Sequence, residues 1–326
     1  MGSRASENMT GNELSVVIPC HNDGKYLSEA IESILSQEHR LGSFEVVVVD
    51  DRSTDEETLD VLERWRREDP TVRVLRNAGA GGPASARNTA VAAATGEWVA
   101  FLDADDVWLP GGLQARWDVV QAQVGAEWIG ADFQEWNENG SLEENGHYHK
   151  DDFVGRILAP AYRSGRALRL ERPIEQFLHS SLTWTGTVMV KRALLQRVGG
   201  FNPALRGPED VHLWYRLALE NDFFFVPQVV ALYRQHAGSL ISRGRRAGQL
   251  QREWDVLYGL LREDPGFRPW RRHLRERLSS VHERYAWDYR ARKRPGSAAW
   301  ATLRALSYTP TRAKLWKALA GALVRR

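Results

Sequence analysis

The amino-acid sequence predicts an α/β fold: a doubly wound mixed sheet followed by a C-terminal helical extension. Over the first hundred residues, short apolar runs rich in β-branched residues alternate with segments in which apolar residues recur at helical spacing. The last quarter of the chain shows the helical spacing alone. With 326 residues, of which 43% are hydrophobic and 26% charged, the chain can form one large domain with an appendage.

The first two predicted strands cover residues 14–18 and 44–49, and both are nearly continuous apolar runs rich in β-branched residues. Such runs are typical of parallel strands that are buried on both faces. Between them, Leu27, Ile31 and Ile34 recur at the spacing of one helical face. This stretch is therefore predicted to be a βαβ unit.

The same alternation continues to the fourth predicted strand. We expect a helix over 56–67, a strand over 72–75, a helix over 84–94 and a strand over 98–102. Four strands that alternate with helices indicate a sheet whose ligands bind at the carboxyl ends of the strands. In the mixed pattern that follows, we expect strands at 185–190 and 223–226, and helices near Ala193 and over 211–219.

Charge divides the chain into two parts. Residues 239–326 hold 21 Lys and Arg against 7 Asp and Glu, whereas the other 238 residues hold 23 against 35. We expect a disordered leader over residues 1–13, a globular domain over 14–238 and a basic helical tail over 239–326. A basic segment can serve nucleic acid, an anionic membrane or the acidic body of its own protein.

The last predicted helix, residues 311–326, has the composition of a helix that lies on a membrane surface. Its apolar residues share one side, and basic residues supply positive charge: Leu315, Trp316, Leu319 and Leu323, with Arg312, Lys314, Lys317, Arg325 and Arg326. The same helix could instead pack on the acidic body of the protein, and both interpretations stay open.

Two absences in the sequence bear on location. No uninterrupted run of about 18 apolar residues occurs, so no membrane-spanning helix is expected. The single cysteine, Cys20, excludes an internal disulfide framework and a cysteine-based zinc site. We expect a cytoplasmic protein, peripheral at the inner membrane face if the last helix binds lipid.

Three aspartates follow the fourth predicted strand: Asp103, Asp105 and Asp106. Carboxylates this close repel one another unless a cation or hydrogen-bond donors compensate. In an extended segment Asp103 and Asp105 point to the same side, and Asp106 is the expected cap of the next turn. Two hard oxygen ligands without clustered His or Cys select Mg²⁺ or Mn²⁺.

Arg87 and Asn88 lie in the first turns of the helix that follows a glycine-rich loop at 78–83. Backbone N–H groups and a guanidinium make an anion site there, because Arg matches phosphate oxygens with two donors. Arg87 could also pair with an acidic neighbour such as Asp103, and the two roles are compatible. The loop is not a P-loop, since no Gly-Lys-Ser/Thr follows.

From about Leu14 to Leu240 the chain resembles the family 2 glycosyltransferases. Six motifs occur in the family's order: residues 17–22, 49–55, 86–88, 101–106, 209–210 before Leu213-Trp214, and 233–236. The resemblance implies a GT-A fold, a nucleotide-sugar donor, a divalent metal and inversion at the anomeric carbon. It divides residues 14–238 into a donor half, about 14–106, and an acceptor half, about 107–238. UDP is the expected nucleotide.

The resemblance also implies where the donor nucleotide binds. His21 stands where the family usually has a tyrosine, in a loop that lies against the base. Asp50 is expected to accept hydrogen bonds from the nucleotide; Asp51 is the alternative contact, or a cap for the helix that begins near Asp55. The full expected donor set is Pro19, His21, Asn22, Asp50, Asp51, Arg87, Asn88, Asp103 and Ala104.

The remaining roles follow from the same resemblance. The metal is expected at Asp103, Asp105 and His236. Asp210 is the expected catalytic base, with Glu209 beside it to position the acceptor or cap the helix; both could instead be ordinary acids of a helix N-terminus. Trp184 could stack on an acceptor sugar or belong to the core.

The sequence thus predicts an enzyme, a glycosyltransferase with a saccharide or lipid-linked acceptor, an anionic membrane surface as a further partner of the tail, and no nucleic acid. One alternative is a catalytically silent glycan-binding or scaffold protein on the same fold. A nucleotidyltransferase is the other. It would need a Gly-rich loop with Arg or Lys directly after the first strand, where this chain has Pro19-Cys20-His21-Asn22.

Overall fold

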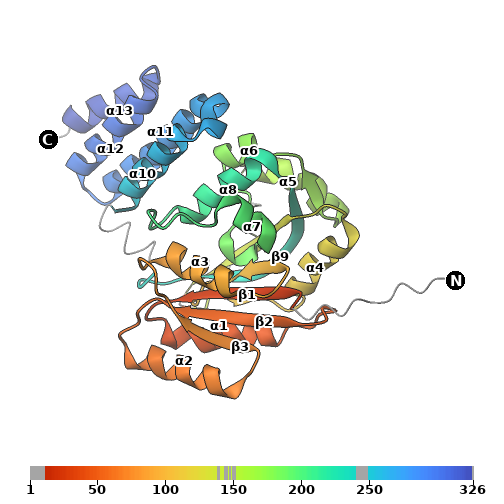
Figure 1. Cartoon of the computed structure of the whole chain (residues 1–326). Coiled ribbons are helices and arrows are strands. Elements are labelled where there is room, and N and C mark those ends of the chain that lie inside the picture. Colours follow the sequence, from red (N-terminus) through yellow and green to blue (C-terminus); the bar gives the residue numbers. More distant parts are fainter. Residues whose placement is uncertain are drawn as a thin grey trace. The chain divides into compact units, whose positions relative to one another are not determined.

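A computed structural model describes residues 12–137, 140–142, 146, 148, 152–239 and 249–324 (Figure 1). The chain forms two compact units. The sheet unit contains the residues up to Pro173 together with Ser181–Ala237, and the helical unit contains Ile174–Ser180 and the residues from Gly238 onward. Within the described residues, we find no helix that combines the length and the apolar character needed to span a bilayer.

The described part of the sheet unit is built on one mixed sheet, in the order β3-β2-β1-β4-β8-β6-β9-β5, with β7 paired to β9. Strands β1 to β4 are parallel, and β4 pairs with β8 in the antiparallel direction. The strands are β1 Leu14–Cys20, β2 Phe44–Asp50, β3 Val72–Arg76, β4 Trp98–Phe101, β5 Val107–Trp108, β6 Trp128–Asn137, β7 Leu168–Leu170, β8 Met189–Lys191 and β9 Phe223–Gln235.

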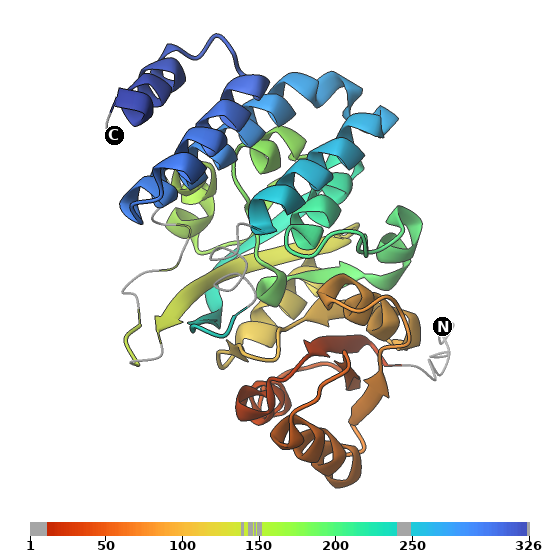
Figure 2. The same ribbon diagram turned by 90° about the vertical axis from the view of Figure 1, so that its left-hand side faces the viewer.

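Helices cover both faces of the parallel strands, as the unbroken apolar runs predict. Figures 1 and 2 show α1 (Gly24–Leu35) and α2 (Glu56–Glu68) on one face and α3 (Pro83–Ala93) on the other. Because β1, β2 and β4 run in parallel, their carboxyl ends share one edge of the sheet. That edge collects Cys20, Asp50 and the residues after Phe101.

The second half of the sheet differs from the prediction. The expected strand over 185–190 begins as the 3₁₀ turn η2, Thr185–Thr187, because Thr187 turns its hydroxyl back to the carbonyl of Trp184 (2.8 Å). The strand at 223–226 extends to Gln235 and pairs with β6, which the mixed pattern did not reveal. The helices here are α4 Gly112–Ala122, α5 Asp152–Ser164, α7 Arg192–Val198 and α8 Glu209–Glu220.

Among its described residues, the helical unit contains α6 (Ile174–His179), α10 (Gln249–Glu263), the 3₁₀ turn η3 (Pro265–Trp270), α11 (Arg271–Ala291), α12 (Pro295–Tyr308) and α13 (Ala313–Val324). Asp255 of α10 joins three of them. Its carboxylate accepts hydrogen bonds from His282 of α11 (3.1 Å) and Tyr308 of α12. Arg304 of α12 adds an ion pair at 2.7 Å.

The apolar side of the last helix is used inside the helical unit. Leu315 and Leu319 are buried against Ala305 and Leu306 of α12, while Trp316 is 53% exposed. Arg312 and Lys314 both pair with Glu283 of α11. Leu315 and Leu319 are therefore covered by another helix of the same unit and are not exposed. The side chains of Leu323, Arg325 and Arg326 lie outside the described residues.

Asp255 should make the helical unit sensitive to acid. Burial raises the pKa of Asp255, but the hydrogen bonds it receives outweigh burial and lower its pKa to about 2. A pKa below the unfolded value of about 3.9 adds stability above about pH 4, which is lost as the pH falls toward about 2. Asp255→Asn should therefore cost about 2 kcal/mol of unfolding free energy at neutral pH and much less near pH 2.5.

Hydrogen exchange of peptides from α10, α11 and α12 at the two pH values would measure this difference. If Asp255→Asn lowers the unfolding free energy by the same amount at both pH values, the charge of Asp255 is not the source of the lost stability.

Candidate active site

The loop after β1 braces the loop after β2. Asn22 adopts a left-handed backbone (φ 59°), and its side-chain oxygen accepts hydrogen bonds from the N–H groups of Thr54 (2.8 Å) and Asp55 (3.3 Å). The ring of His21 lies 2.8 Å from the carbonyl oxygen of Asp51 through Nδ1. Pro19 is half-buried at the end of β1, and the side chains of His21 and Asn22 are exposed.

The two aspartates after β2 have different partners. Asp50 accepts the N–H of Ser53 (2.8 Å). Asp51 uses both oxygens, one for Asn77 (2.6 Å) and one for the N–H of Gly82 (2.5 Å), so it holds the glycine-rich loop. Asp51 is not the cap of α2, because Asp55 caps that helix through the N–H of Thr58 (2.8 Å).

Arg87 links two acidic segments that are far apart in the sequence. Its side chain is buried, with Nη2 at 2.6 Å from Asp103 and Nη1 at 2.8 Å from Glu209. The ring of Phe201 lies beneath the guanidinium, with its centroid 5.4 Å away. The predicted pairing of Arg87 with Asp103 is thus present, and a second carboxylate shares the same cation.

Asn88 points elsewhere. Its amide group donates to the carbonyl of Phe201 (2.7 Å) and accepts the N–H of the same residue (2.9 Å). Consecutive residues of a helix are rotated by about 100°, so Asn88 cannot share the direction of Arg87. In this structure Asn88 braces the segment before α8 rather than facing the strand ends.

Of the three aspartates after β4, Asp103 and Asp105 are partly exposed and Asp106 is buried. The side chains of Asp103 and Asp105 are 27% and 20% exposed. Ala104 between them is buried. Asp106 is also buried and accepts the N–H of Arg234 in β9 (2.7 Å). The expectation that Asp106 caps the next turn is therefore wrong: its partner comes from a distant strand.

His236 approaches this pair from β9's end, with Nε2 at 2.8 Å from Asp105. No three His, Cys, Asp or Glu side chains of the described residues form a ready-made metal cage. Mg²⁺ in proteins is commonly held by one or two carboxylates together with substrate phosphates. Asp103 and Asp105, partly exposed at a strand end, fit that mode of binding.

Arg234 contacts the same loop, which the sequence pattern did not predict. Its Nε donates to the carbonyl of Asp105 (2.8 Å), and its Nη2 pairs with Glu29 (2.6 Å). The guanidinium lies between the rings of Tyr26 and Trp136, at 4.7 and 4.0 Å from their centroids. Its place within the motif 233–236 was the available signal.

Asp23 was also missed. Burial raises its pKa to about 6, and the charge of Asp105 adds to the effect, although the N–H of His21 opposes it. A carboxyl group so near Asp105 adds to the negative charge at the strand ends, which a bound cation would relieve.

Glu209 and Asp210 begin α8. Asp210 accepts a hydrogen bond from the hydroxyl of Thr185 (3.1 Å) and another from the N–H of Val211 (2.7 Å). Burial raises the pKa of Asp210, and it raises the pKa of Glu209 to about 7 against the pull of Arg87. These acids do more than complete a helix end, since each has a specific partner from another element.

Side chains from β5 and α4 hold the turn that carries Thr185. The indole N–H of Trp108 donates to the carbonyl of Gly186 (2.8 Å). Arg116, fully buried on α4, donates to the carbonyl of Thr187 (3.3 Å) and lies over the Trp108 ring. Trp184, just before the turn, is half-buried in an aromatic cluster with Phe133 and Tyr233, at centroid distances of 4.9 and 5.2 Å.

The sequence matches a family model described as glycosyl transferase family 2 over residues 15–195, more than half of the chain. Glycosyltransferase GlyG of Streptococcus pneumoniae is 28% identical over 234 residues, which cover 70% of this chain and 72% of GlyG. UDP-Glc:alpha-D-GlcNAc-diphosphoundecaprenol beta-1,3-glucosyltransferase WfgD of Escherichia coli is 26% identical over 283 residues, which cover 86% of this chain and 98% of WfgD.

Solved structures match the fold. TarS 1–349 of S. aureus in complex with UDP-GlcNAc has a TM-score of 0.64 at 20% identity, covering 95% of this chain and 88% of that one. Mannosyltransferase PcManGT from Pyrobaculum calidifontis, in complex with GDP-Man and Mn²⁺, has a TM-score of 0.59 at 22% identity, covering 97% and 82%. The predicted GT-A fold is confirmed, and the chain is a glycosyltransferase that belongs to glycosyl transferase family 2.

Proposed function

We propose that this glycosyltransferase is an inverting, metal-dependent enzyme that transfers a sugar from a UDP-sugar to a hydroxyl group of a saccharide or lipid-linked acceptor. The observation that carries the proposal is the bridge made by Arg87, which ties Asp103 at the end of β4 to Glu209 beside Asp210. The guanidinium of Arg87 therefore contacts one carboxylate of the pair Asp103 and Asp105 and one of the pair Glu209 and Asp210.

Asp103 and Asp105 would hold a divalent ion, Mn²⁺ or Mg²⁺, and His236 hydrogen-bonds Asp105 at their side. Such an ion neutralises the charge that develops on the departing diphosphate. Asp50 and the loop with Pro19, His21 and Asn22 lie at the carboxyl ends of the neighbouring strands β1 and β2. There they would offer hydrogen-bond partners to the nucleotide. Arg87 is used by two carboxylates here, so its part is to orient them as well as to offset negative charge.

Asp210 acts as the base. It removes the proton of the acceptor hydroxyl while that oxygen bonds to the anomeric carbon and the bond from this carbon to the diphosphate oxygen breaks. A single displacement of this kind inverts the anomeric carbon. Burial favours the role, because a carboxylate with a raised pKa is a stronger base. Glu209, tied to Arg87, keeps the pair in place.

The substrates are supported by the names of the relatives. WfgD is named for UDP-Glc and for an acceptor linked to diphosphoundecaprenol. TarS, of which 94 residues are 40% identical and cover 29% of this chain and 16% of TarS, is named as a poly(ribitol-phosphate) transferase. A UDP-sugar donor and a lipid-linked or polymeric acceptor are therefore the first substrates to assay.

Removal of the metal should abolish transfer, and loss of either ligand should lower it strongly. We expect Asp103→Asn and Asp105→Asn each to lose at least about tenfold in activity without unfolding, because each removes one carboxylate of the pair. The assay is sugar release from UDP-, GDP- and dTDP-sugars with Mn²⁺, with and without EDTA. Asp118→Asn, which alters an exposed acid on α4, is the matched control. Full turnover in excess EDTA contradicts the metal assignment.

Asp210→Asn should lower the transfer rate by about 10² to 10⁴, the usual contribution of a general base. Affinity for UDP and Mn²⁺, measured by calorimetry, should stay near that of the unmodified enzyme. If Glu209→Gln is inactive and Asp210→Asn transfers normally, the roles within the pair are reversed. If both variants stay active, neither acid is the base.

Thr185→Val should shift the pH dependence of transfer. The hydroxyl of Thr185 stabilises the ionised form of Asp210, so its removal should raise the pKa of that carboxyl. Because the base must be ionised, the acid limb of kcat/KM should move to higher pH, and activity should recover at alkaline pH. A uniform loss at every pH would assign Thr185 a purely structural role.

A further inference from the structure

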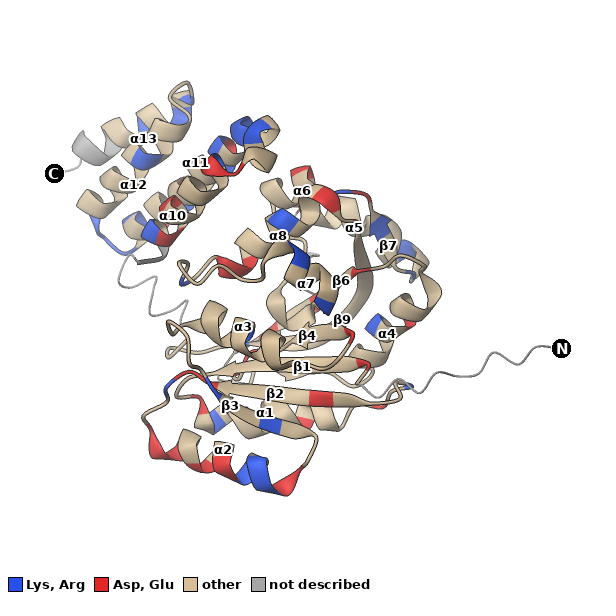
Figure 3. Ribbon diagram, in the orientation of Figure 1, with Lys and Arg blue, Asp and Glu red and all other residues tan. Residues whose placement is uncertain are grey.

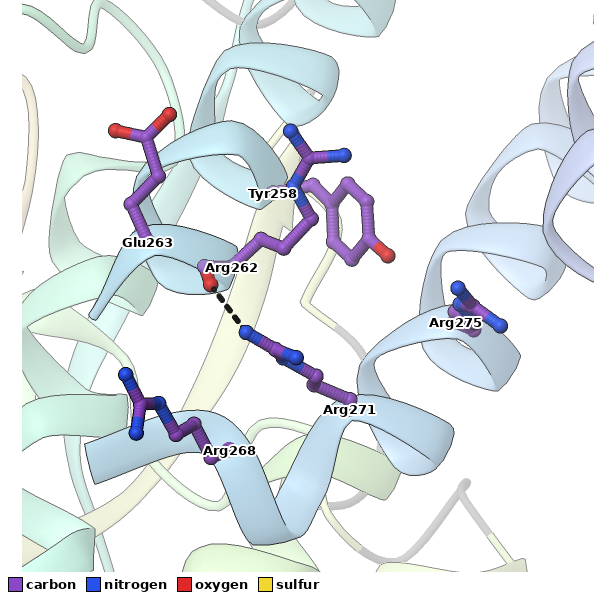
Figure 4. Close-up of a pocket in the computed structure, with 6 residues that line it drawn as sticks. All are labelled: Tyr258, Arg262, Glu263, Arg268, Arg271 and Arg275. Carbon is purple, nitrogen blue, oxygen red and sulfur yellow. Dashed lines mark hydrogen bonds between the residues drawn. The ribbon is translucent and has the colours of Figure 1, made fainter. Parts of the chain in front are cut away.

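An open cavity of about 480 Å³ lies in the helical unit, at the corner where α10 meets η3 and α11 (Figure 4). Its lining consists of Tyr258, Arg262, Glu263, Arg268, Arg271 and Arg275, and we call it the arginine pocket. Arg262 comes from the last turn of α10, Arg268 from η3, and the other two arginines from α11. Figure 4 shows Arg271 between Arg262 and Arg268.

The backbone of this corner is well anchored. Phe267, in the middle of η3, is fully buried. Asp264 accepts the N–H of Gly266 (2.8 Å) and starts the turn. Arg271 donates from Nη2 to the carbonyl of Arg262 (3.3 Å), which ties the two helices together across the opening. These contacts hold the backbone segments that carry the four arginines.

The positive charge of the pocket is not neutralised within the described chain. Among the described residues, no carboxylate forms an ion pair with any of the four arginines, and Glu263 is the only acid in the lining. Other arginines of the helical unit do have partners: Arg272, next to the pocket, pairs with Glu276 at 3.0 Å, and Arg292, just after the far end of α11, pairs with Asp288 at 3.2 Å. Figure 3 shows Lys and Arg gathered at this end of α11.

Four guanidinium groups that line one cavity without counter-charges repel one another, and an anion bound in the cavity reduces that repulsion. The planar guanidinium matches phosphate oxygens with two parallel hydrogen bonds. The cavity is in the size range of small-ligand sites, so it has room for more than one phosphate group.

We propose that the arginine pocket binds a phosphate or diphosphate group. The proposal goes beyond the proposed transferase chemistry and does not depend on it. The group could arrive on a soluble molecule or on the headgroup of an anionic lipid, and the chemistry of recognition is shared.

The test compares the full chain with two double variants of equal charge. Arg268→Gln with Arg271→Gln alters the pocket. Arg252→Gln with Arg292→Gln removes the same charge from the helical unit outside the lining. All four side chains are exposed, so both variants should fold, and circular dichroism checks this. Replacement of Arg268 and Arg271 by Lys keeps the charge but removes the two-donor geometry.

Calorimetry with inorganic pyrophosphate is the first arm. We expect the pocket variant to bind at least about tenfold more weakly, the Lys variant to be intermediate and the control variant to match the unmodified chain. Pyrophosphate that binds at the strand ends of the sheet unit is common to all four proteins and cancels in the comparison. The readout is binding, so an inactive transferase would leave the test intact.

Co-sedimentation with vesicles is the second arm, with phosphatidylcholine alone or mixed with phosphatidylglycerol. A preference for the anionic vesicles that only the pocket variant loses assigns the site to a lipid headgroup. Pyrophosphate binding lost in the pocket variant without such a preference assigns it to a soluble phosphate. Equal losses in the pocket and control variants, or no binding to either probe, overturn the proposal.

Discussion

The geometry of the candidate site depends on the contacts of the buried guanidinium of Arg87. It pairs with Asp103, 16 residues away, and with Glu209, 122 residues away. Removing one partner of a buried ion pair leaves an uncompensated charge, which costs about 3 to 5 kcal/mol. The loop after β4 and the start of α8 are therefore held together by Arg87. The hydrogen bonds of Asn88 with Phe201 hold α3 against the segment before α8 as well.

The parallel part of the sheet could be predicted because its strands are short, mainly apolar runs that alternate with segments of helical spacing. The strand expected at 185–190 was right only for its last residues, because the turn η2 takes Thr185–Thr187 and β8 begins at Met189. Among the site residues, the pairing of Arg87 with Asp103 was foreseen. The role of Asp106 was not, since its partner, Arg234, is 128 residues away. Periodicity describes local structure and says nothing about such long-range partners.

The C-terminal helices illustrate another limit of the sequence pattern. An apolar stripe with flanking basic residues fits a helix on a membrane and a helix in a bundle equally well. The choice depends on whether another helix covers the stripe, and here α12 covers Leu315 and Leu319. The leucines of the stripe are thus buried and do not form an exposed apolar face beside the basic residues of the tail. Part of it is concentrated instead at the arginine pocket between α10 and α11.

The dependence of the aspartate loop on β9 has a consequence for the order in which the protein is made. Asp106 is buried against the N–H of Arg234, and the carbonyl of Asp105 is held by the same arginine. A ribosome that has released only the first four strands has produced the acids of the loop but not the strand that shapes it. The loop can reach its final geometry only after β9 has emerged and paired with β5. Until then the nascent chain carries the parallel strands β1 to β4, while the aspartate loop at their carboxyl ends lacks its final contacts.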